Sequence, residues 1–219
     1  MMSTPMTKLA QVLLQKSETL NLFSTGDRLK LDEKHIPDSL AVLDFWKPAD
    51  GSRVLDMGTG GGLPGLALAQ ACPSVHFLLV DSVAKKIKAV QEMANELGLS
   101  NLKPVCGRLE ALAHQAKYRE NFDAVTARAL AELPTLLEYA AGFLKVGGFF
   151  YAWKSADFQL ELGLSKEAQK VLGLQFVRAY NYTLPGGESR SILEFEKIRP
   201  LPAGYPRKEG MPKAKPLLS

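Results

Sequence analysis

The sequence predicts an α/β fold with one seven-stranded sheet, parallel in its first five strands and completed by an antiparallel hairpin. From Gly51 onward, short apolar runs rich in β-branched residues alternate with helical patterns, which is typical of parallel βαβ units. The last two strand patterns are joined by Pro185-Gly186-Gly187, a turn sequence that indicates a hairpin. The composition, with 46% apolar and 23% charged residues, is that of a chain with a packed core.

The expected elements follow in chain order. Leucines at helical spacing predict an amphipathic helix over Met6–Leu20, and a second helical region covers Leu31–Trp46, with Pro37 marking a break or a first turn. Strands are expected at Arg53–Met57, Val75–Val80, Lys103–Cys106, Phe122–Thr126, Gly148–Trp153, Gln175–Tyr182 and Ser191–Ile198. Further helices are expected at Gly65–Ala71, Ala84–Leu97, Leu109–Ala116, Leu133–Leu144 and Asp157–Leu172. We therefore divide the chain into an N-terminal helical extension (1–50), a Rossmann-like domain (51–198) and a C-terminal tail (199–219).

The formal net charge of +4 lies in the C-terminal tail. Five of the 27 basic residues and one of the 23 acidic residues fall within 199–219, so 1–198 holds 22 of each sign. The five basic residues are Arg199, Arg207, Lys208, Lys213 and Lys215. A basic tail is a common contact for nucleic-acid phosphate, and a merely solubilising terminus fits the count equally well. If the tail binds RNA, its deletion should weaken RNA binding and spare cofactor binding.

The sequence also bears on where the chain works. Apolar stretches such as Phe77–Val80 are far too short to span a bilayer, and Met1–Lys16 lacks the features of a secretory signal. Cys72 and Cys106 show neither metal-ligand spacing nor a disulfide framework. We expect a cytoplasmic chain with no membrane and no metal partner, and a monomer by default.

The most informative segment is Val54-Leu55-Asp56-Met57-Gly58-Thr59-Gly60-Gly61-Gly62-Leu63-Pro64-Gly65. A buried strand pattern runs into a glycine cluster, and Pro64 suits the first turn of the next helix. Glycine lets the backbone pass close to a ligand because no Cβ intervenes, and ligands of open α/β sheets bind outside the carboxyl ends of the strands. Gly58 and Gly60 are therefore candidates for cofactor binding.

Two cofactors fit this loop. The spacing Gly60-x-Gly62-x-x-Gly65, with Asp81 at the distance of a ribose-binding acid, matches the fingerprint of dinucleotide enzymes. Asp56 is poorly placed beside a pyrophosphate, but it would suit the sulfonium and amino group of S-adenosylmethionine. The terminal hairpin is likewise unlike the usual dinucleotide sheet and agrees with the class I methyltransferase sheet. S-Adenosylmethionine is favoured, and an NAD-dependent oxidoreductase is the alternative.

Polar residues follow the carboxyl ends of the next strands. Asp81 could accept both ribose hydroxyls, or it could favour the dipole of the following helix. Leu109 could offer a backbone N–H and an apolar contact to adenine, and Glu110 alone would be an ordinary helix-start acid. Arg128 lies near an apolar strand end, so it needs a carboxylate or phosphate partner, either a ligand or a buried Asp or Glu.

The absence of several motifs reduces the number of reactions that the sequence is compatible with. Methyltransferases that modify exocyclic base amines usually carry an Asn/Asp-Pro-Pro-aromatic element where this sequence reads Thr126-Ala127-Arg128-Ala129. Methylation of a pyrimidine carbon needs a catalytic cysteine, for which Cys72 is too remote and Cys106 a poor candidate. A Ser-Tyr-Lys proton-donor set for an oxidoreductase is not found, and a non-catalytic RNA-binding protein would not need the glycine loop. An acceptor that is already nucleophilic, such as guanine N7, fits best, and no catalytic residue is assigned.

With these residues assembled, the chain resembles the bacterial 16S rRNA guanine-N7 methyltransferase G family, also called glucose-inhibited division protein B. The likeness extends over nearly the whole chain, and Leu63-Pro64-Gly65 and His35–Leu40 are its most specific parts. Mild departures occur at Thr25-Gly26-Asp27 and at Gly61, where some relatives carry proline. The likeness is carried by Asn21-Leu22, Lys34-His35, Asp38-Ser39-Leu40, the loop Asp56–Gly65, Lys85-Lys86, Asn101, Arg108-Leu109-Glu110, Ala127-Arg128-Ala129, Tyr205-Pro206-Arg207-Lys208, Gly210, Pro212 and Pro216.

The resemblance implies a class I S-adenosylmethionine-dependent methyltransferase fold. It implies donor contacts at Gly58, Leu63, Leu109, Glu110 and Arg128. It also implies the acceptor, N7 of the guanine conventionally numbered 527 in the 530 loop of 16S rRNA, on free rRNA or a 30S assembly particle. It supplies no general base.

Overall fold

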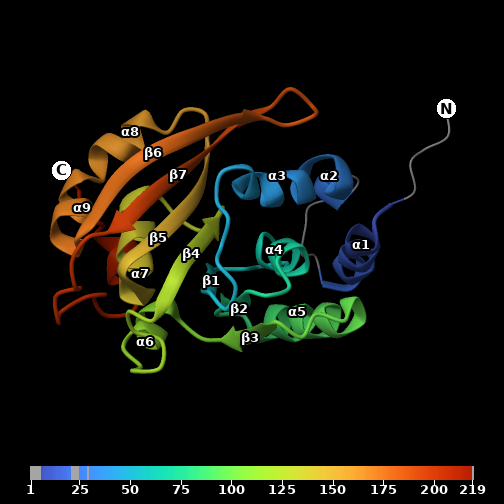
Figure 1. The fold of residues 1–219 in the computed structure, drawn as a ribbon, viewed down its shortest axis with the longest axis horizontal. Helices are drawn as coiled ribbons and strands as arrows, with labels where there is room; N and C mark the ends of the chain where they lie inside the picture. Colours follow the sequence, from blue (N-terminus) through green and yellow to red (C-terminus); the bar gives the residue numbers. More distant parts are fainter. Residues whose placement is uncertain (1–5, 21–24, 29, 219) are drawn as a thin grey trace.

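A seven-stranded sheet runs through the molecule in the order β3-β2-β1-β4-β5-β7-β6 (Figure 1). In this computed structural model, which describes residues 6–20, 25–28 and 30–218, β1 to β5 pair in parallel. Strand β7 pairs antiparallel with both β5 and β6. The strands are β1 Arg53–Met57, β2 His76–Asp81, β3 Leu102–Cys106, β4 Phe122–Arg128, β5 Leu144–Ser155, β6 Leu174–Thr183 and β7 Ser189–Lys197. The predicted fold class, including its terminal hairpin, is confirmed.

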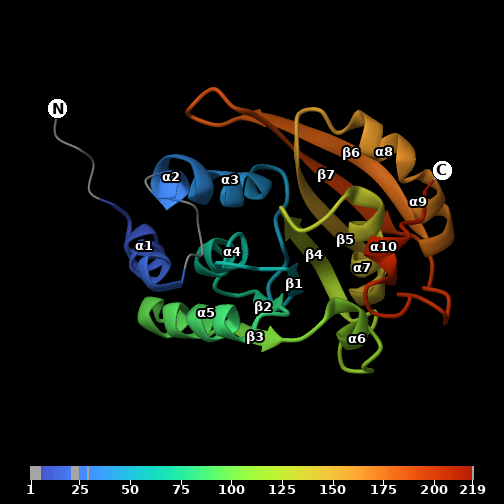
Figure 2. The same cartoon turned by 180° about the vertical axis from the view of Figure 1, so that it is seen from behind.

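Helices cover both faces of the sheet (Figures 1 and 2). Along β1, Val54 packs into an apolar cluster with α1, α4 and α5, whereas Leu55 packs into a second cluster with α6, α7 and α9. This alternation is the two-residue period of a strand buried on both faces. None of the helices that the structure describes has the length and apolar character needed to span a bilayer. They are α1 Lys8–Leu20, α2 Thr25–Arg28, the π-helical turn η1 Leu31–His35, α3 Ile36–Leu40, the 3₁₀ turn η2 Ala41–Asp44, α4 Gly65–Ala71, α5 Ala84–Leu97, α6 Leu109–Ala113, α7 Leu133–Phe143, α8 Gln159–Leu164, α9 Lys166–Leu172 and α10 Met211–Ala214.

Three helical predictions differ from the structure by more than two residues or by a break. The region Leu31–Trp46 is a run of three short turns, with Pro37 in the first turn of α3. The helix expected over Asp157–Leu172 is broken at Ser165, whose hydroxyl donates to the Leu162 carbonyl at 2.8 Å and competes with the helical backbone. Helix α6 ends at Ala113, because the chain turns there and the next side chain reaches a backbone carbonyl of the C-terminal tail. The motif residues Asn21-Leu22 lie outside the described residues.

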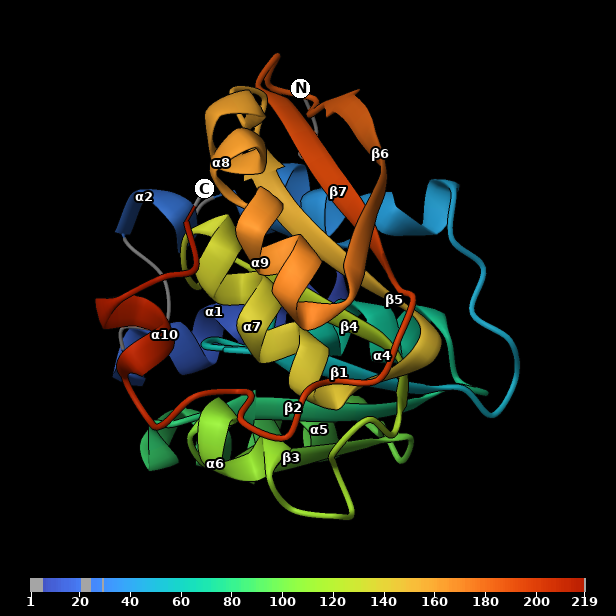
Figure 3. The same cartoon turned by 90° about the vertical axis from the view of Figure 1, so that its left-hand side faces the viewer.

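The C-terminal tail packs on the domain (Figure 3), where it runs past α6 and α7 to α10. Leu201, Pro206 and Pro212 are buried. The Arg119 guanidinium donates to the Tyr205 carbonyl at 2.8 Å, and the Thr135 hydroxyl of α7 donates to the Pro212 carbonyl at 3.0 Å. The tail is therefore part of the folded unit through most of its length.

An ion pair between Arg207 and Glu138 anchors this tail. Glu138 lies in the middle of α7, and its side chain is 1% exposed. Its two oxygens accept the Arg207 backbone N–H at 2.7 Å and the guanidinium Nη2 at 2.6 Å, with Nε at 3.0 and 3.1 Å. A buried carboxylate left without this partner would be uncompensated, so the tail contributes to stability.

Arg207→Met should lower the free energy of unfolding by about 3–5 kcal/mol, because it leaves the Glu138 carboxylate buried and unpaired. For a chain of this size that corresponds to a melting temperature lower by roughly 10 °C. The matched control is Lys208→Met, which changes the exposed neighbour and should melt like the parent. Equal melting temperatures for the two variants would contradict this role of the pair.

Candidate functional site

The glycine-rich loop leaves the carboxyl end of β1, as the sequence predicted. Gly58 and Gly60 have φ of +65° and +54°, the left-handed region that favours glycine. The Thr59 N–H donates to the Val80 carbonyl at 2.9 Å, and the Gly60 N–H donates to Asp81 Oδ2 at 3.0 Å. These bonds bend the loop toward the end of β2.

Asp56 holds the loop from beneath. Its side chain is fully buried, Oδ2 accepts the Gly65 N–H at 3.2 Å, and Oδ1 accepts the Thr126 hydroxyl at 2.8 Å. Burial raises the pKa of this carboxyl to about 6, against the opposing effect of the hydrogen bonds from Thr126 and Gly65. The sequence suggested that Asp56 faces a sulfonium. In the structure it instead joins β1, α4 and β4, because both of its oxygens are engaged within the protein.

A small pocket of about 100 Å³ opens beside Gly58 and brings four predicted donor contacts together. Two further residues of its wall, Leu130 and Tyr139, were not singled out by the sequence. Both lie beyond β4, and nothing in their local pattern distinguishes them from core residues. The predicted contacts that line the pocket are Gly58, Asp81, Leu109 and Glu110.

The two acids of this pocket also hold backbone. Asp81 accepts the Gly60 N–H and, through Oδ1, the Val83 N–H at 2.9 Å ahead of α5. Glu110 Oε1 accepts the Gly210 N–H at 2.9 Å and the Tyr139 hydroxyl at 3.4 Å. Each carboxylate has about four acceptor positions, so both retain capacity for a ligand.

The other predicted contacts lie outside the lining of this pocket. Gly60 joins it through its bond to Asp81, and Leu63 is buried in the apolar cluster beneath the loop. Leu109, which does line the pocket, is the first residue of α6, so its backbone N–H has no partner within that helix. Arg128, at the end of β4, lines a second and larger cavity.

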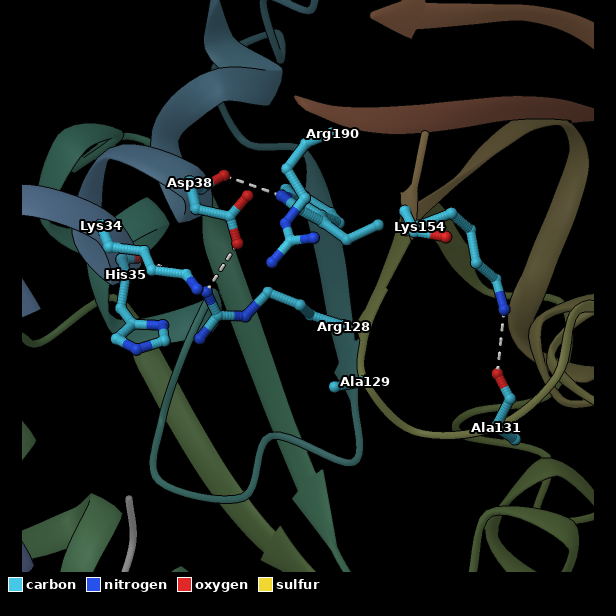
Figure 4. A pocket seen from close by; sticks show the side chains of 10 residues that line it. Lys34, His35, Asp38, Arg128, Ala129, Ala131, Lys154 and Arg190 are labelled. Carbon is cyan, nitrogen blue, oxygen red and sulfur yellow. Dashed lines mark hydrogen bonds and ion pairs between the residues drawn. The ribbon is translucent and has the colours of Figure 1, made fainter. Parts of the chain in front are cut away.

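Arg128 is paired with Asp38 in that larger cavity (Figure 4). Its Nη1 donates to Asp38 Oδ2 at 2.9 Å and to the His35 carbonyl at 3.2 Å. Asp38 also accepts the Tyr182 hydroxyl, and its backbone carbonyl accepts the Trp153 indole N–H at 2.7 Å. The segment His35–Leu40 therefore ties the N-terminal helices to β4, β5 and β6. The sequence singled out this segment but could not name the acid as the partner of Arg128.

The larger cavity has a volume of about 460 Å³ and a cationic wall. Lys34, Lys154 and Arg190 line it together with Arg128 (Figure 4). The Lys154 ammonium donates to the Ala131 carbonyl at 3.1 Å and pairs with a glutamate at 2.6 Å. Lys34 and Arg190 both pair with Glu188, so each of the four cations has a carboxylate partner. The four cations outnumber the three carboxylates that pair with them, which favours a phosphate-bearing ligand.

The two cavities share one short segment of chain after β4. Arg128 and Ala129 line the larger cavity, and Leu130 lines the pocket beside Gly58. Ala129 has a φ of +54°, which is uncommon for a residue with a Cβ and marks a sharp turn at this point. Ligands in the two cavities would therefore contact consecutive residues of the same short segment.

Other chemistries find little support among the described residues. No group of three or more His, Cys, Asp or Glu within them could hold a metal ion. Cys106 is exposed on β3, 3.7 Å from the Ser82 carbonyl, and Cys72 lines a separate cavity beside Lys47. Neither thiol lines the pocket beside Gly58 or the cationic cavity.

Comparison with known proteins identifies the family. The family model described as rRNA small subunit methyltransferase G matches residues 2–191. The chain belongs to this family. The ribosomal RNA small subunit methyltransferase G of Desulfitobacterium hafniense is 41% identical over 95% of this chain and 87% of its own length. That of Deinococcus radiodurans is 40% identical over 96% and 83%.

Solved structures share the fold of this methyltransferase G family member. A SAM-dependent methyltransferase from Aquifex aeolicus superposes with a TM-score of 0.59 at 17% identity, over 80% of this chain and 100% of that one. The [4+2]-cyclase SpnF superposes equally well, with a TM-score of 0.59 at 16% identity, over 74% of this chain and 80% of that one. The fold alone therefore does not identify the reaction, which has to be inferred from the residues of the site.

Gly58→Val should abolish binding of S-adenosylhomocysteine. A Cβ at this position would lie 2.5 Å from Leu130 Cδ1 at the pocket wall, and the left-handed backbone adds strain of about 1–3 kcal/mol. The matched control is Gly51→Val, which has a φ of +76° and nothing within 4 Å of the added Cβ. Calorimetric titration of both folded variants separates the two effects. Similar affinities for the two would contradict the placement of Gly58 in the donor pocket.

Asp56→Asn should change how stability depends on pH. The folded pKa of Asp56, about 6, exceeds the ordinary value of 3.8, so the folded state binds more protons between these values. Ionisation of Asp56 therefore lowers stability as pH rises from about 4 to about 6, by about 3 kcal/mol in total. Urea unfolding at several pH values should show this decline removed in Asp56→Asn and kept in the exposed control Asp157→Asn. A decline of equal size in both variants would exclude Asp56 as its source.

Proposed function

We propose that the protein transfers the methyl group of S-adenosylmethionine to N7 of guanine 527 of 16S rRNA, free or in a 30S assembly particle. As a member of the methyltransferase G family it is an S-adenosylmethionine-dependent rRNA methyltransferase. The observation that carries the finer proposal is the pairing of two cavities at the carboxyl ends of the strands. One is lined by the glycine loop and two acids, the other by four cations.

The pocket beside Gly58 suits the adenosine part of the donor. Asp81 would accept the ribose hydroxyls, and Leu109 and Glu110 would meet the adenine edge. Glycine backbone at Gly58 and Gly60 allows close approach of the ligand, with Leu63 supporting the loop from beneath. The pocket is smaller than the usual ligand site of about 300–1,000 Å³. The group that must give way is the tip of Leu130, a flexible side chain that lies over Gly58.

Arg128 suits a carboxylate, which the amino-acid part of the donor carries. Its guanidinium already binds a carboxylate oxygen of Asp38 at 2.9 Å, and it has five N–H donors in all. We assign Arg128 to the donor's carboxylate end, at the boundary between the two cavities. The methyl group would then be presented toward the cationic cavity.

The cationic cavity suits the acceptor nucleotide. Guanine N7 has an exposed lone pair and no proton to lose, so transfer needs an aligned base more than a general base. Lys34, Lys154 and Arg190 would contact the phosphates that flank this base. No side chain is assigned a proton transfer.

The proposal also covers the role of the tail cations, the location and oligomeric state of the protein, and its need for a metal. Of the five tail cations, Arg207 is bound to Glu138, whereas Arg199, Lys208, Lys213 and Lys215 are exposed and available to RNA phosphate. We propose a cytoplasmic monomer that needs no metal. An NAD-dependent oxidoreductase is disfavoured by the family to which the chain belongs.

Methylation of guanine N7 should be visible as a labile site in the rRNA. The product base is positively charged, so borohydride followed by aniline should cleave 16S rRNA at that guanine after incubation with enzyme and donor. The Gly58→Val protein should give no cleavage. A methyl label recovered on a cytosine carbon or an adenine amine would contradict the N7 assignment.

A further inference from the structure

Residues 205–212, here called the C-terminal strap, cross α6 and α7 (Figure 3). Gly210 of this strap contacts Glu110, which lines the pocket proposed for the donor. The strap is anchored at Arg207, whose guanidinium and backbone N–H bind the buried Glu138 carboxylate. A second anchor lies beside it, where a ring nitrogen of His114 lies 2.9 Å from the Pro206 carbonyl oxygen. Beyond these anchors, the strap turns at Gly210, whose φ is +78°.

This turn aims a backbone N–H at the donor pocket. The Gly210 N–H donates to Glu110 Oε1 at 2.9 Å, and the Tyr139 hydroxyl approaches the same oxygen at 3.4 Å. Burial and the neighbouring Glu110 carboxylate raise the pKa of Tyr139 to about 12, so its hydroxyl stays a donor. Oε1 is thus occupied by protein groups, whereas Oε2 takes part in no hydrogen bond or ion pair within the described part of the chain.

Glu110 lies in a short helix, and the strap holds one of its carboxylate oxygens. Helix α6 is only five residues long, and Glu110 is 5% exposed at its first turn. The strap lies outside the residues matched by the family model, which ends at 191. A segment beyond the matched region therefore contacts Glu110, a residue of the pocket wall.

We propose that the C-terminal strap positions Glu110, so that its second oxygen accepts the 6-amino group of the donor's adenine. The proposal rests on the function proposed above, in which this pocket takes adenosine. The strap then sets both the affinity for the donor and the discrimination between adenine and a purine without that amine. Charge counting alone gave a different expectation, in which deletion of the tail spares cofactor binding.

The test compares proteins that end at Lys208 and at Lys215. The first lacks Gly210 but keeps the Arg207–Glu138 pair, and the second keeps the whole strap. Calorimetry with S-adenosylhomocysteine should give a dissociation constant about tenfold higher for the first, the scale of one hydrogen bond to a charged group. S-Inosylhomocysteine, which has an oxygen in place of the 6-amino group, should bind both proteins alike.

A second pair of full-length variants guards against a truncated chain that does not fold. Gly210→Pro removes the N–H that Glu110 accepts and cannot keep the φ of +78°, so it displaces the turn, whereas Gly210→Ala keeps the N–H at the cost of strain at that φ. The proline variant should lose the discrimination between the two nucleoside ligands, and the alanine variant should retain it.

Parental affinity and discrimination in the Lys208-terminated protein or in Gly210→Pro would overturn the proposal. So would an equal loss for both ligands, which would make the strap a structural support only. A parent protein that binds neither ligand would instead overturn the proposed donor site itself.

Discussion

The buried carboxylate of Asp56 fixes the ends of two neighbouring strands and the start of a helix, and the geometry of both cavities depends on it. It binds the Gly65 N–H at the start of α4 and the Thr126 hydroxyl in β4. The first contact shapes the glycine loop beside the pocket proposed for the donor. The second holds β4 two residues before Arg128, at the boundary of the cationic cavity. Burial disfavours the ionised form of this acid, and the raised pKa records that cost.

Local pattern was sufficient to predict most of the fold. Arg53–Met57, Gly65–Ala71 and Ala84–Leu97 have their predicted bounds, because apolar runs there are bounded by clear turn residues. Contacts between distant parts of the chain could not be predicted in this way. Charge counting placed Arg207 in a free tail, because its partner Glu138 lies 69 residues earlier in a helix that reads as apolar core.

In the candidate site, too, local features could be predicted from the sequence and contacts between distant segments could not. Residues at strand ends were predictable, because parallel strands bring their carboxyl ends to one edge of the sheet; Gly58, Asp81, Leu109 and Glu110 accordingly line one pocket. The groups that orient them, such as Gly210, come from remote segments with no local signal. A [4+2]-cyclase shares the fold, so the sheet by itself does not identify the reaction.

A glycine loop that serves a methyl donor and one that serves a dinucleotide differ in the ligand they bind. Calorimetric titration of the intact protein with S-adenosylhomocysteine and with NAD, under identical conditions, distinguishes the two. We expect saturable binding of S-adenosylhomocysteine at one site per chain and no measurable heat with NAD. Binding of NAD with the tighter dissociation constant would contradict this expectation.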